Sequence, residues 1–525
     1  MLVLKFGGTS VGSPQAIRSL VSIVQDAEHA GRVRLVVVSA FSKVTDTLID
    51  MAKKAEAGDQ SYAAMVAALK TRHLETVSAL IPSQDQGQVL RYIDEQCAYL
   101  ERILEGVAAI GELSPKTLDL VMSFGERLSA FIIAQVFTSG GNQAEYLDAR
   151  QVVRTDDQFG SARFLPEETY PRIQAYLANH PALQIATGFI GATEDGKTTT
   201  LGRGGSDLSA AIFGAAIGAR EIEIWTDVDG ILTSDPKLVP NAFRIDSISY
   251  QEAMELSHFG AKVLHPPTVK PALEKGIPIR IRNTFNPSCR GTLIANQVPP
   301  STYPVRGISS MRDIALIRIQ GSGMVGVAGF SSRLFGCLAR KKINVILITQ
   351  ASSEYSICFA VLPKDALQAA AAIKEEFEAE IAHGAIDAPV IEKDLSIVAV
   401  VGERMKSTPG IAGKVFHALG RNGINIVAIA QGSSELNISA VISRLDEGKA
   451  LNAIHDAFHQ PNGEGQIEDA IKQNQTDLCV EKCPVADPKN LSVEQKKRQQ
   501  KGGRRRHAIG DRPEKDIIGA RQPPA

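Results

Sequence analysis

The sequence predicts an α/β protein whose first half contains a parallel sheet and whose second half is a duplicated module. In the first half, apolar runs at residues 2–6 and 34–39 flank a segment with helical spacing, which together read as a βαβ unit. The second run is continuously apolar from Leu35 to Val38, as in a parallel strand that is covered on both faces. From residue 313 onward the sequence repeats itself without gaps at an offset of about 81 residues. A period of this length indicates a duplicated module rather than a solenoid.

Length, charge and cysteine content narrow the class of protein. The 525 residues are enough for roughly three or four domains. A net charge of -1 argues against nucleic acid and anionic membrane as partners of the whole protein. There is no apolar run of membrane-spanning length and no signal sequence, and six scattered cysteines fit a reducing compartment. We therefore expect a cytoplasmic protein. Cys479 and Cys483 lack a second ligand pair, so we expect no metal site.

The first strand ends in a lysine and two glycines. Lys5 precedes Phe6, Gly7 and Gly8, and two hydroxyl residues follow. Glycines let the backbone approach a ligand, and successive turn N–H groups can bind an anion, so this loop suggests a phosphate site. The lysine precedes the glycines, so the loop is not a Walker A motif. The alternative is a surface lysine beside an ordinary Gly-Gly turn.

Further elements follow in the order expected of an α/β domain. The predicted elements are a helix at 14–29, a mostly helical region at 47–135, a short strand within 144–160, and strands at 183–189 and from 222. Ligands of such sheets bind beyond the carboxyl ends of the strands, where the hydroxyl-rich segment 39–46 lies.

A second glycine cluster opens a helix at residues 201–207. Its first turn carries Ser206 and Asp207, and Arg203 precedes them. A helix N-terminus attracts an anion by roughly 1 kcal/mol, although Asp207 can also serve as a simple cap. Downstream, Thr226 and Asp227 end a strand, and the lysines at 237 and 262 lie near turns.

Seven motifs in register resemble aspartokinase over residues 1–295. They are KFGGTSV at 5–11, VVVSAFSKVTD at 36–46, FGERLSA at 124–130, GRGGSD at 202–207, WTDVDGI at 225–231, TSDP at 233–236 and FGAKVLHP at 259–266. The resemblance implies the amino-acid kinase fold, an open and largely parallel sheet with helices on both faces. It also implies transfer of the γ-phosphate of ATP, with Mg²⁺, to the side-chain carboxylate of L-aspartate. The product would be 4-phospho-L-aspartate, in the first step of lysine, threonine and methionine biosynthesis.

The resemblance also implies roles for individual residues. Lys5 and Asp207 would be catalytic, with Lys5 neutralising the transferring phosphoryl group. The residues implied to hold aspartate are Ser39, Thr45, Glu126, Phe189, Arg203 and Ser206. The residues implied to hold ATP are Lys5, Gly7, Gly8, Thr226, Asp227, Lys237 and Lys262. Within the first group, Arg203 would face a carboxylate and Glu126 the ammonium.

Two residues depart from the family pattern. Leu232 stands where family members often have a tyrosine near the adenine, so the resemblance does not assign a residue to the adenine contact. Lys43 stands where glycine is frequent, so the loop geometry could differ. The proposed chemistry needs no strong general base, because a carboxylate acceptor is already ionised at neutral pH.

The duplicated half is similar to a pair of ACT domains, small βαββαβ modules of ferredoxin-like topology that bind amino acids. We expect them at 305–390 and 391–460, with a strand at 305–310 that could belong to either copy. By resemblance, Gln350 and Gln431 would contact threonine, lysine or both as feedback effectors. The alternative is that each glutamine satisfies strand backbone at a domain interface. ACT modules usually pair edge to edge, so we expect a homodimer or a higher homo-oligomer.

The C-terminal stretch limits the resemblance to bifunctional relatives. Residues 461–525 are polar and weakly periodic, so we expect them to be disordered, and no G-x-G-x-x-G follows residue 459. A homoserine dehydrogenase activity is therefore not expected. Three origins of residues 461–525 fit the sequence equally: a natural extension, a truncated gene, or an altered reading of a former dehydrogenase region. Two alternative functions are another amino-acid kinase, acting on glutamate, acetylglutamate or a nucleoside monophosphate, and a catalytically inactive ACT sensor.

Overall fold

The computed structural model describes residues 1–26, 28–260, 266–350, 355–406, 408–432 and 434–459. These residues belong to one compact unit. Lys262, the Cys479–Cys483 pair and the predicted tail lie outside the described residues.

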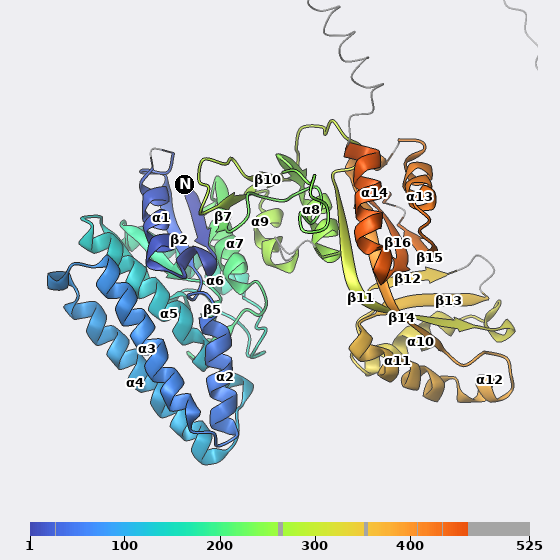
Figure 1. The fold of residues 1–525 in the computed structure, drawn as a ribbon. Helices are drawn as coiled ribbons and strands as arrows, with labels where there is room; N and C mark the ends of the chain where they lie inside the picture. The colour runs from blue at the N-terminus through green and yellow to red at the C-terminus, as the bar shows by residue number, and fades with distance from the viewer. Residues whose placement is uncertain (27, 261–265, 351–354, 407, 433, 460–525) are drawn as a thin grey trace, which may run out of the picture. The chain divides into compact units, whose positions relative to one another are not determined.

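The first half is built on an eight-stranded sheet with the order β3-β4-β2-β1-β7-β9-β10-β8 (Figure 1). All neighbouring pairs are parallel except β9 with β10. Its strands are β1 (Leu2–Phe6), β2 (Val33–Val38), β3 (Ala144–Leu147), β4 (Leu183–Thr187), β7 (Glu221–Thr226), β8 (Ser247–Ser249), β9 (Ile279–Asn283) and β10 (Thr292–Ala295). The expected open and largely parallel sheet is confirmed. A separate hairpin, β5 (Ile190–Ala192) with β6 (Thr198–Thr200), follows β4.

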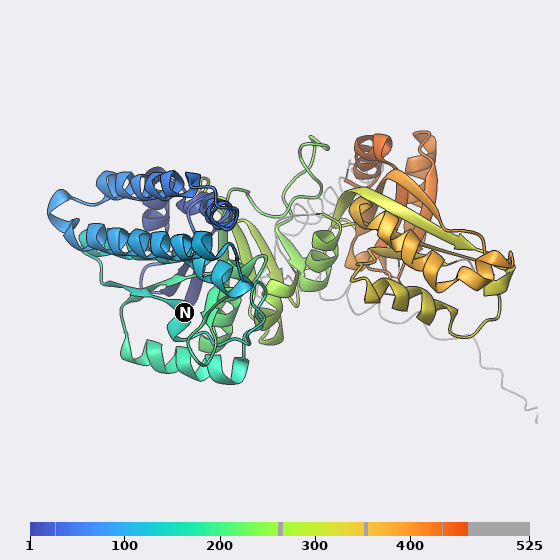
Figure 2. The ribbon, with the colours of Figure 1, turned by 90° about the horizontal axis from the view of Figure 1, so that it is seen from below.

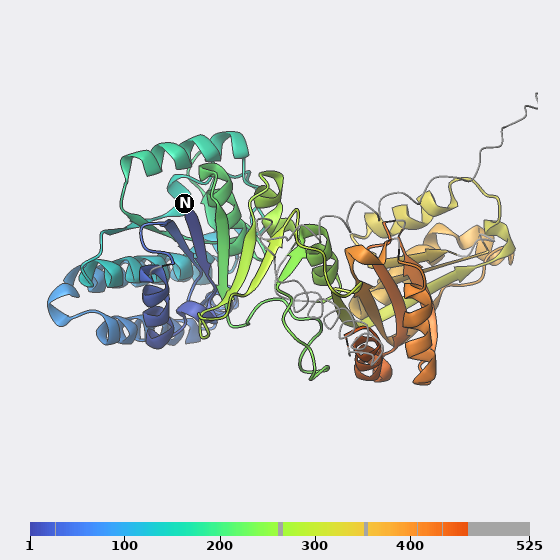
Figure 3. The same cartoon turned by 90° about the horizontal axis from the view of Figure 1, so that it is seen from above.

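Helices cover both faces of this sheet. The helices on or beside it are α1 (Pro14–Gln25), α2 (Val44–Glu56), α3 (Ser61–Leu80), α4 (Gly87–Ile110), α5 (Pro115–Ser139), α6 (Pro166–Asn179), α7 (Gly205–Ile217), α8 (Tyr250–His258) and α9 (Lys270–Glu274). Figures 2 and 3 show the blue helices α1–α4 on one side of the sheet and α6 on the other. Alternate residues of β1 enter separate cores: Leu4 packs with α1–α5, and Val3 packs with α6 and α7.

Local sequence signals explain where several of these helices begin. Ser13 caps α1 by accepting a hydrogen bond from the Ala16 N–H, and Pro14 occupies the first helical position. Ser114 and Pro115 do the same for α5. Helix α1 ends at Gln25, four residues before the predicted end at His29, because the chain turns at Asp26.

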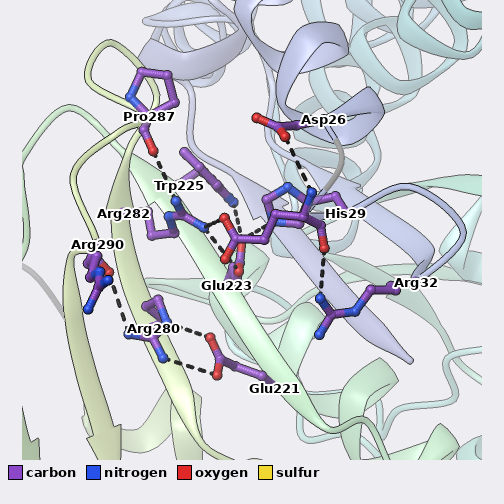
Figure 4. Close-up of polar contacts among 11 residues, drawn as sticks. Asp26, His29, Arg32, Glu221, Glu223, Trp225, Arg280, Arg282, Pro287 and Arg290 are labelled. Atoms are coloured by element: carbon purple, nitrogen blue, oxygen red, sulfur yellow. Dashed lines mark hydrogen bonds and ion pairs between the residues drawn. The ribbon is translucent and has the colours of Figure 1, made fainter.

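The residue excluded from α1 joins a buried charged cluster, which we call the His29 cluster (Figure 4). His29 Nε2 lies 2.9 Å from Glu223 Oε2, and the Trp225 Nε1–H donates to the same oxygen at 2.9 Å. Arg282 Nη1 lies 3.5 Å from Glu223 Oε1 and 3.1 Å from Glu28 Oε2. The alternation of strand side chains places Glu223 of β7 and Arg282 of β9 on one face of the sheet.

Helix α5 is the one described helix that is long and apolar enough to cross a bilayer. The sequence interpretation, based on runs of apolar residues, did not single it out. In the structure, 83% of its most apolar 18-residue window is buried inside the protein. Helix α5 is therefore a buried core helix, and core helices of this kind can match the length and composition of a membrane span.

The second half forms a six-stranded sheet with the order β12-β13-β11-β14-β16-β15. Its strands are β11 (Gly307–Gln320), β12 (Leu347–Gln350), β13 (Ser356–Val361), β14 (Val390–Val401), β15 (Ile426–Gln431) and β16 (Asn437–Ser443). Its helices are α10 (Phe330–Arg340), α11 (Pro363–Glu376), α12 (Glu378–Ala382), α13 (Ile411–Arg421) and α14 (Glu447–His459).

Two long strands each run through both copies of the repeat. Residues 307–311 of β11 pair with 397–401 of β14, and residues 316–318 of β11 pair with 390–392 of β14. The strand at 305–310, left unassigned by the sequence, therefore completes the sheet beside the second copy. The repeat is also visible in the backbone, because Asp313 and Asp394 at the strand irregularities both have left-handed conformations, with φ of 55° and 57°.

Candidate active site

The carboxyl ends of β1 and β2 and the start of α7 surround a cavity of about 630 Å³. Nine of the residues predicted from the sequence line it. They are Lys5, Gly8, Ser39, Thr45, Glu126, Phe189, Arg203, Ser206 and Asp207. A shared cavity for residues up to 202 positions apart is the result of parallel strands that end at the same edge of the sheet.

The centre of this cavity is an ion pair between Lys5 and Asp207. Lys5 Nζ lies 2.7 Å from Asp207 Oδ1, and their side chains are 10% and 16% exposed. The carboxylate oxygen has no well-aligned hydrogen bond in the structure, so charge attraction holds the pair. Asp207 lies in the first turn of α7, where the helix dipole favours a negative group. The arrangement leaves a lysine ammonium at the carboxyl end of β1, in a site that water can reach.

Glycines at two places allow the backbone to come this close. A Cβ on Gly8 would lie 3.2 Å from the Ala40 carbonyl oxygen, so a larger residue would push the β1 and β2 loops apart. Gly204 at the start of α7 has φ of +71°, which glycine adopts without strain. No side chain caps α7, so its positive end stays available to an anion.

Glu126 of α5 is a buried carboxylate with few partners. Its side chain belongs to a residue that is 3% exposed, and Oε1 accepts one hydrogen bond from the Ala40 N–H at 3.1 Å. The second oxygen, Oε2, has no hydrogen-bond partner. Burial raises the pKa of Glu126 to about 8, despite the hydrogen bond from Ala40 and the charge of Lys5. A bound cation would supply the partner that this carboxylate lacks.

The lining of the cavity also includes an arginine and two residues with unusual backbone conformations. Arg203 is exposed, and among the described residues its guanidinium has no hydrogen bond or ion pair. Phe189 and Lys43 both have φ of +67°. Lys43 thus has a left-handed conformation, which glycine adopts without strain and a lysine adopts at a cost.

The residues predicted to hold the nucleotide fall into two groups. Lys5, Gly7 and Gly8 lie at the end of β1, whereas Thr226, Asp227 and Lys237 lie at the end of β7 and beyond it. The Thr226 hydroxyl donates to Asp227 Oδ1 at 3.2 Å, and Asp227 and Lys237 are both exposed. Gly7 joins the two strands through its N–H, which donates to the Trp225 carbonyl at 3.0 Å. Leu232 forms a bridge with Arg244 in the loop between β7 and β8. Lys5 and Gly8 line the 630 Å³ cavity, but its lining does not include Gly7, Thr226, Asp227, Leu232 or Lys237.

The two glutamines predicted to bind an effector occupy matching strand ends. Gln350 is exposed at the end of β12 and lines a cavity of about 130 Å³ beside the start of α10. The other lining residues are Met324, Val327, Gly329, Phe330, Ser331, Ser332 and Ile357. Gln431 is exposed at the end of β15.

Two residues at the site were missed by sequence reasoning. Arg72 of α3 donates from Nη1 to the Ser42 carbonyl at 2.9 Å and from Nη2 to the Gly12 carbonyl at 3.1 Å, so it joins the loop after β2 to the loop after β1. Asp119 of α5 holds backbone on the far side of the cavity. Neither residue lies in a glycine-rich motif, and an isolated arginine or aspartate on a helix is usually a solvated charge.

Family comparisons agree with this architecture. The amino acid kinase family matches residues 1–283, and the ACT domain family matches 317–377 and 398–458. A bifunctional aspartokinase/homoserine dehydrogenase of Arabidopsis thaliana is 40% identical over 471 residues, which cover 87% of this chain and 50% of that protein. The chain thus spans about half the length of the bifunctional relatives.

The chain aligns with a larger share of the relatives that are named as aspartokinases alone. Aspartokinase 1 of Arabidopsis thaliana is 34% identical over 469 residues, which are 87% of this chain and 80% of that protein. The crystal structure of E. coli aspartokinase III with aspartate and ADP is 31% identical, has a TM-score of 0.73, and aligns with 87% of this chain and 99% of that one. The chain therefore belongs to the aspartokinase family, with an amino acid kinase region followed by paired ACT modules.

Proposed function

We propose that this protein is an aspartate kinase, which transfers the γ-phosphate of ATP to the side-chain carboxylate of L-aspartate. The observation that carries the proposal is the single cavity that brings the Lys5–Asp207 pair together with the unpartnered Glu126. A relative of known structure, E. coli aspartokinase III, has been crystallised with aspartate and ADP. The product, 4-phospho-L-aspartate, would enter lysine, threonine and methionine biosynthesis.

The chemistry asks more for charge neutralisation than for proton transfer. The acceptor carboxylate is ionised at neutral pH, so it attacks phosphorus without a general base. Negative charge on the equatorial oxygens must be balanced in the transition state. Lys5 supplies a full positive charge there, and the uncapped start of α7 adds the partial charge of a helix N-terminus. Asp207 orients Lys5 through the 2.7 Å contact.

The same cavity has complementary groups for both ends of aspartate. Arg203 presents a planar guanidinium that suits a carboxylate, and Glu126 presents a carboxylate that suits the ammonium. Ser39, Thr45 and Ser206 add hydroxyls to the walls, and Phe189 adds a ring. The unmet hydrogen-bonding capacity of Glu126 disfavours a substrate without an amino group.

Mg²⁺ is expected to arrive with the nucleotide. Among the described residues there is no group of three or more His, Cys, Asp or Glu side chains that could hold a metal ion. This fits Mg²⁺, which commonly binds through one or two carboxylates and the phosphates of its nucleotide. We expect Asp207, which lines the cavity, to be a carboxylate that contacts Mg²⁺, and bound Mg²⁺ would add further positive charge near the phosphates.

We further propose that amino acids regulate the enzyme through the ACT pair. The 130 Å³ cavity at Gln350 is of a size for a small side chain, and E. coli aspartokinase III has also been crystallised with lysine. Lysine, threonine or both would be the effectors, with Gln350 and Gln431 as contacts. We expect a homodimer or a higher oligomer, and a cytoplasmic location, whereas the plant relatives are named as chloroplastic.

A coupled assay of ADP release tests the function. The purified chain should release ADP with MgATP and aspartate, and not with glutamate, acetylglutamate or a nucleoside monophosphate as the acceptor. Activity with another acceptor alone would establish a different amino-acid kinase, and no activity with any acceptor would favour an inactive sensor. Repeating the assay with lysine and with threonine tests regulation, and unchanged activity in both titrations would count against it.

A further inference from the structure

A second carboxylate on α5 holds backbone on the far side of the active-site cavity. Asp119 precedes Glu126 by seven residues, which is about two helical turns, so both project from one face of α5. Asp119 is 0% exposed. In the part of the chain that the structure describes, no lysine, arginine or histidine forms an ion pair with it.

Three hydrogen bonds satisfy this carboxylate instead. Oδ2 accepts from the Gly160 N–H at 2.9 Å and from the Thr200 N–H at 3.0 Å. Oδ1 accepts from the Thr200 hydroxyl at 2.7 Å. Each donor belongs to a segment beside the cavity, because Gly160 lines it and Thr200 ends β6, three residues before Arg203.

The two held segments also contact each other. The Ala162 N–H donates to the Thr200 carbonyl at 2.9 Å. Gly202 has φ of +74°, and a Cβ on it would lie 3.4 Å from Ser161 Cα. The chain just before Arg203 therefore rests on the loop around Gly160, and one carboxylate joins both segments to α5. Helix α5 also carries Glu126, so Asp119 links the two charged walls of the cavity.

We propose that Asp119 is a positioning residue that sets the spacing between Glu126 and Arg203, and with it the length of amino-acid substrate that the cavity accepts. This inference rests on the proposed aspartate kinase function. The two walls grip opposite ends of a substrate, so a change in their spacing alters binding of aspartate before it alters the phosphoryl-transfer groups. Misplacement of a substrate-binding group by about 1 Å can lower the rate a hundredfold, so a single carboxylate that positions such a group can have a large effect on activity.

The experiment compares three variants in the full-length chain. Thr200→Val removes the hydroxyl that donates to Asp119 and keeps both backbone donors. Thr200→Ser keeps the hydroxyl and is the matched control. Asp119→Asn keeps the shape of the side chain but places an NH₂ group against N–H donors. We measure KM and kcat for aspartate, KM for ATP, activity with glutamate, and melting temperature for each.

We expect Thr200→Val to raise KM for aspartate by about tenfold, because the segment before Arg203 loses one of its hydrogen bonds to Asp119 and Arg203 shifts from its place. Asp119→Asn should raise KM for aspartate further and reduce the ratio of activity with aspartate to activity with glutamate. In both, KM for ATP should stay within about twofold, and Thr200→Ser should match the wild type. These values separate positioning from stability, because a purely structural role would lower the melting temperature without selecting one substrate.

The inference is overturned if Thr200→Val lowers the melting temperature while both KM values and the glutamate preference stay unchanged. It is also overturned if KM for ATP and KM for aspartate rise together in Thr200→Val. If Asp119→Asn does not fold, Thr200→Val decides the question. A wild-type chain without aspartate-dependent ADP release would contradict the proposed function itself, whereas an active wild type with unaffected variants contradicts only the role of Asp119.

Discussion

Glu126 and Glu223 are buried to the same degree in one domain, yet their surroundings are opposite. Glu126 is 3% exposed and Glu223 is 2% exposed. Glu223 has hydrogen bonds from His29 and Trp225 and an ion pair with Arg282. Glu126 has one backbone donor and an oxygen without a partner. Burial alone therefore does not tell a structural carboxylate from a candidate ligand-binding one, whereas the set of partners does.

The two carboxylates are accordingly shifted in opposite directions. Burial alone would raise the pKa of Glu223, but the hydrogen bond and charge of His29, with Arg282 and Trp225, lower it. Burial likewise opposes the charge on His29, yet Glu223 raises the pKa of His29. At Glu126 burial dominates and raises the pKa to about 8. In the His29 cluster, neighbouring charges and hydrogen bonds stabilise the charged forms of the side chains without a ligand. The charged form of Glu126 lacks such partners, so this residue favours binding a proton or a cation.

The largest expected effect is on stability, at the His29 cluster. Glu223→Gln should destabilise the domain by about 3–5 kcal/mol, because it removes the charge that both His29 and the buried Arg282 contact and leaves Arg282 with only the exposed Glu28. Activity per folded molecule should persist, since the cluster does not line the active-site cavity. Chemical denaturation measures the loss, and Glu221→Gln, at a more exposed pair with Arg280, is the control with a smaller effect. A loss below about 1 kcal/mol would contradict the comparison.

Lys5→Ala should lower activity strongly and stability only slightly, which is the reverse of the effect expected for Glu223→Gln. We expect kcat to fall a hundredfold or more, on the order of 3 kcal/mol of activation free energy, because the phosphoryl oxygens lose their nearest cation. Stability should change less than in Glu223→Gln, since the pair with Asp207 is partly hydrated. Lys54→Ala, at an exposed ion pair with Asp59, is the control for a lost surface lysine. Near-normal turnover in Lys5→Ala would remove Lys5 from the mechanism.

Glu126→Gln should weaken aspartate binding and change the response to pH. A charge-assisted contact with the substrate ammonium is worth about 2 kcal/mol, so KM for aspartate should rise roughly 30-fold. In the empty protein the folded-state pKa of Glu126 lies near 8, above its ordinary value of 4.5. The folded state then binds the extra proton, so this group's stabilisation is full below about pH 4.5 and is lost as the pH rises through 8.

Melting temperatures of the ligand-free protein between pH 5 and 8.5 test that sign. The decline with rising pH should be smaller in Glu126→Gln than in the wild type. Glu223 provides the internal contrast, because its lowered pKa stabilises the fold above the ordinary pKa of a glutamate and that contribution is lost as the pH falls. Identical pH profiles for wild type and Glu126→Gln would show that Glu126 is not the carboxyl that titrates.

The smallest expected effect comes from Trp225→Phe. Phenylalanine keeps a ring beside Phe6 and Arg282 but removes the N–H that donates to Glu223. We expect a loss of roughly 1.5 kcal/mol, which is the lower range for a hydrogen bond to a charged group. Chemical denaturation measures it, and Phe6→Leu, which alters the same ring stack and leaves the hydrogen bond, is the comparison. A double variant with Glu223→Gln should lose less than the sum of the single effects.

Sequence reasoning recovered the parts of the site that have a local signature. Gly204 has φ of +71°, which few other residues adopt, and Gly8 leaves no room for a Cβ beside the Ala40 carbonyl, so both glycines are recognisable in the sequence. Lys5 and Asp207 lie close to them along the chain. The same reasoning missed Asp119 and Arg72, whose partners are loops in other parts of the chain. It also extended α1 through His29, since helical spacing does not show that Glu223, 194 residues away, will bind its ring.

By itself, the sequence determined the alternation of strands and helices, the glycine turns and the 81-residue duplication, because backbone sterics and side-chain periodicity act over a few neighbouring residues. Only the tertiary structure decided which buried carboxylate is paired and which is left open, and how β11 and β14 are shared between the ACT copies. The reason is that hydrogen bonding and charge depend on atoms within a few ångströms in space, and the chain brings those atoms together from distant positions.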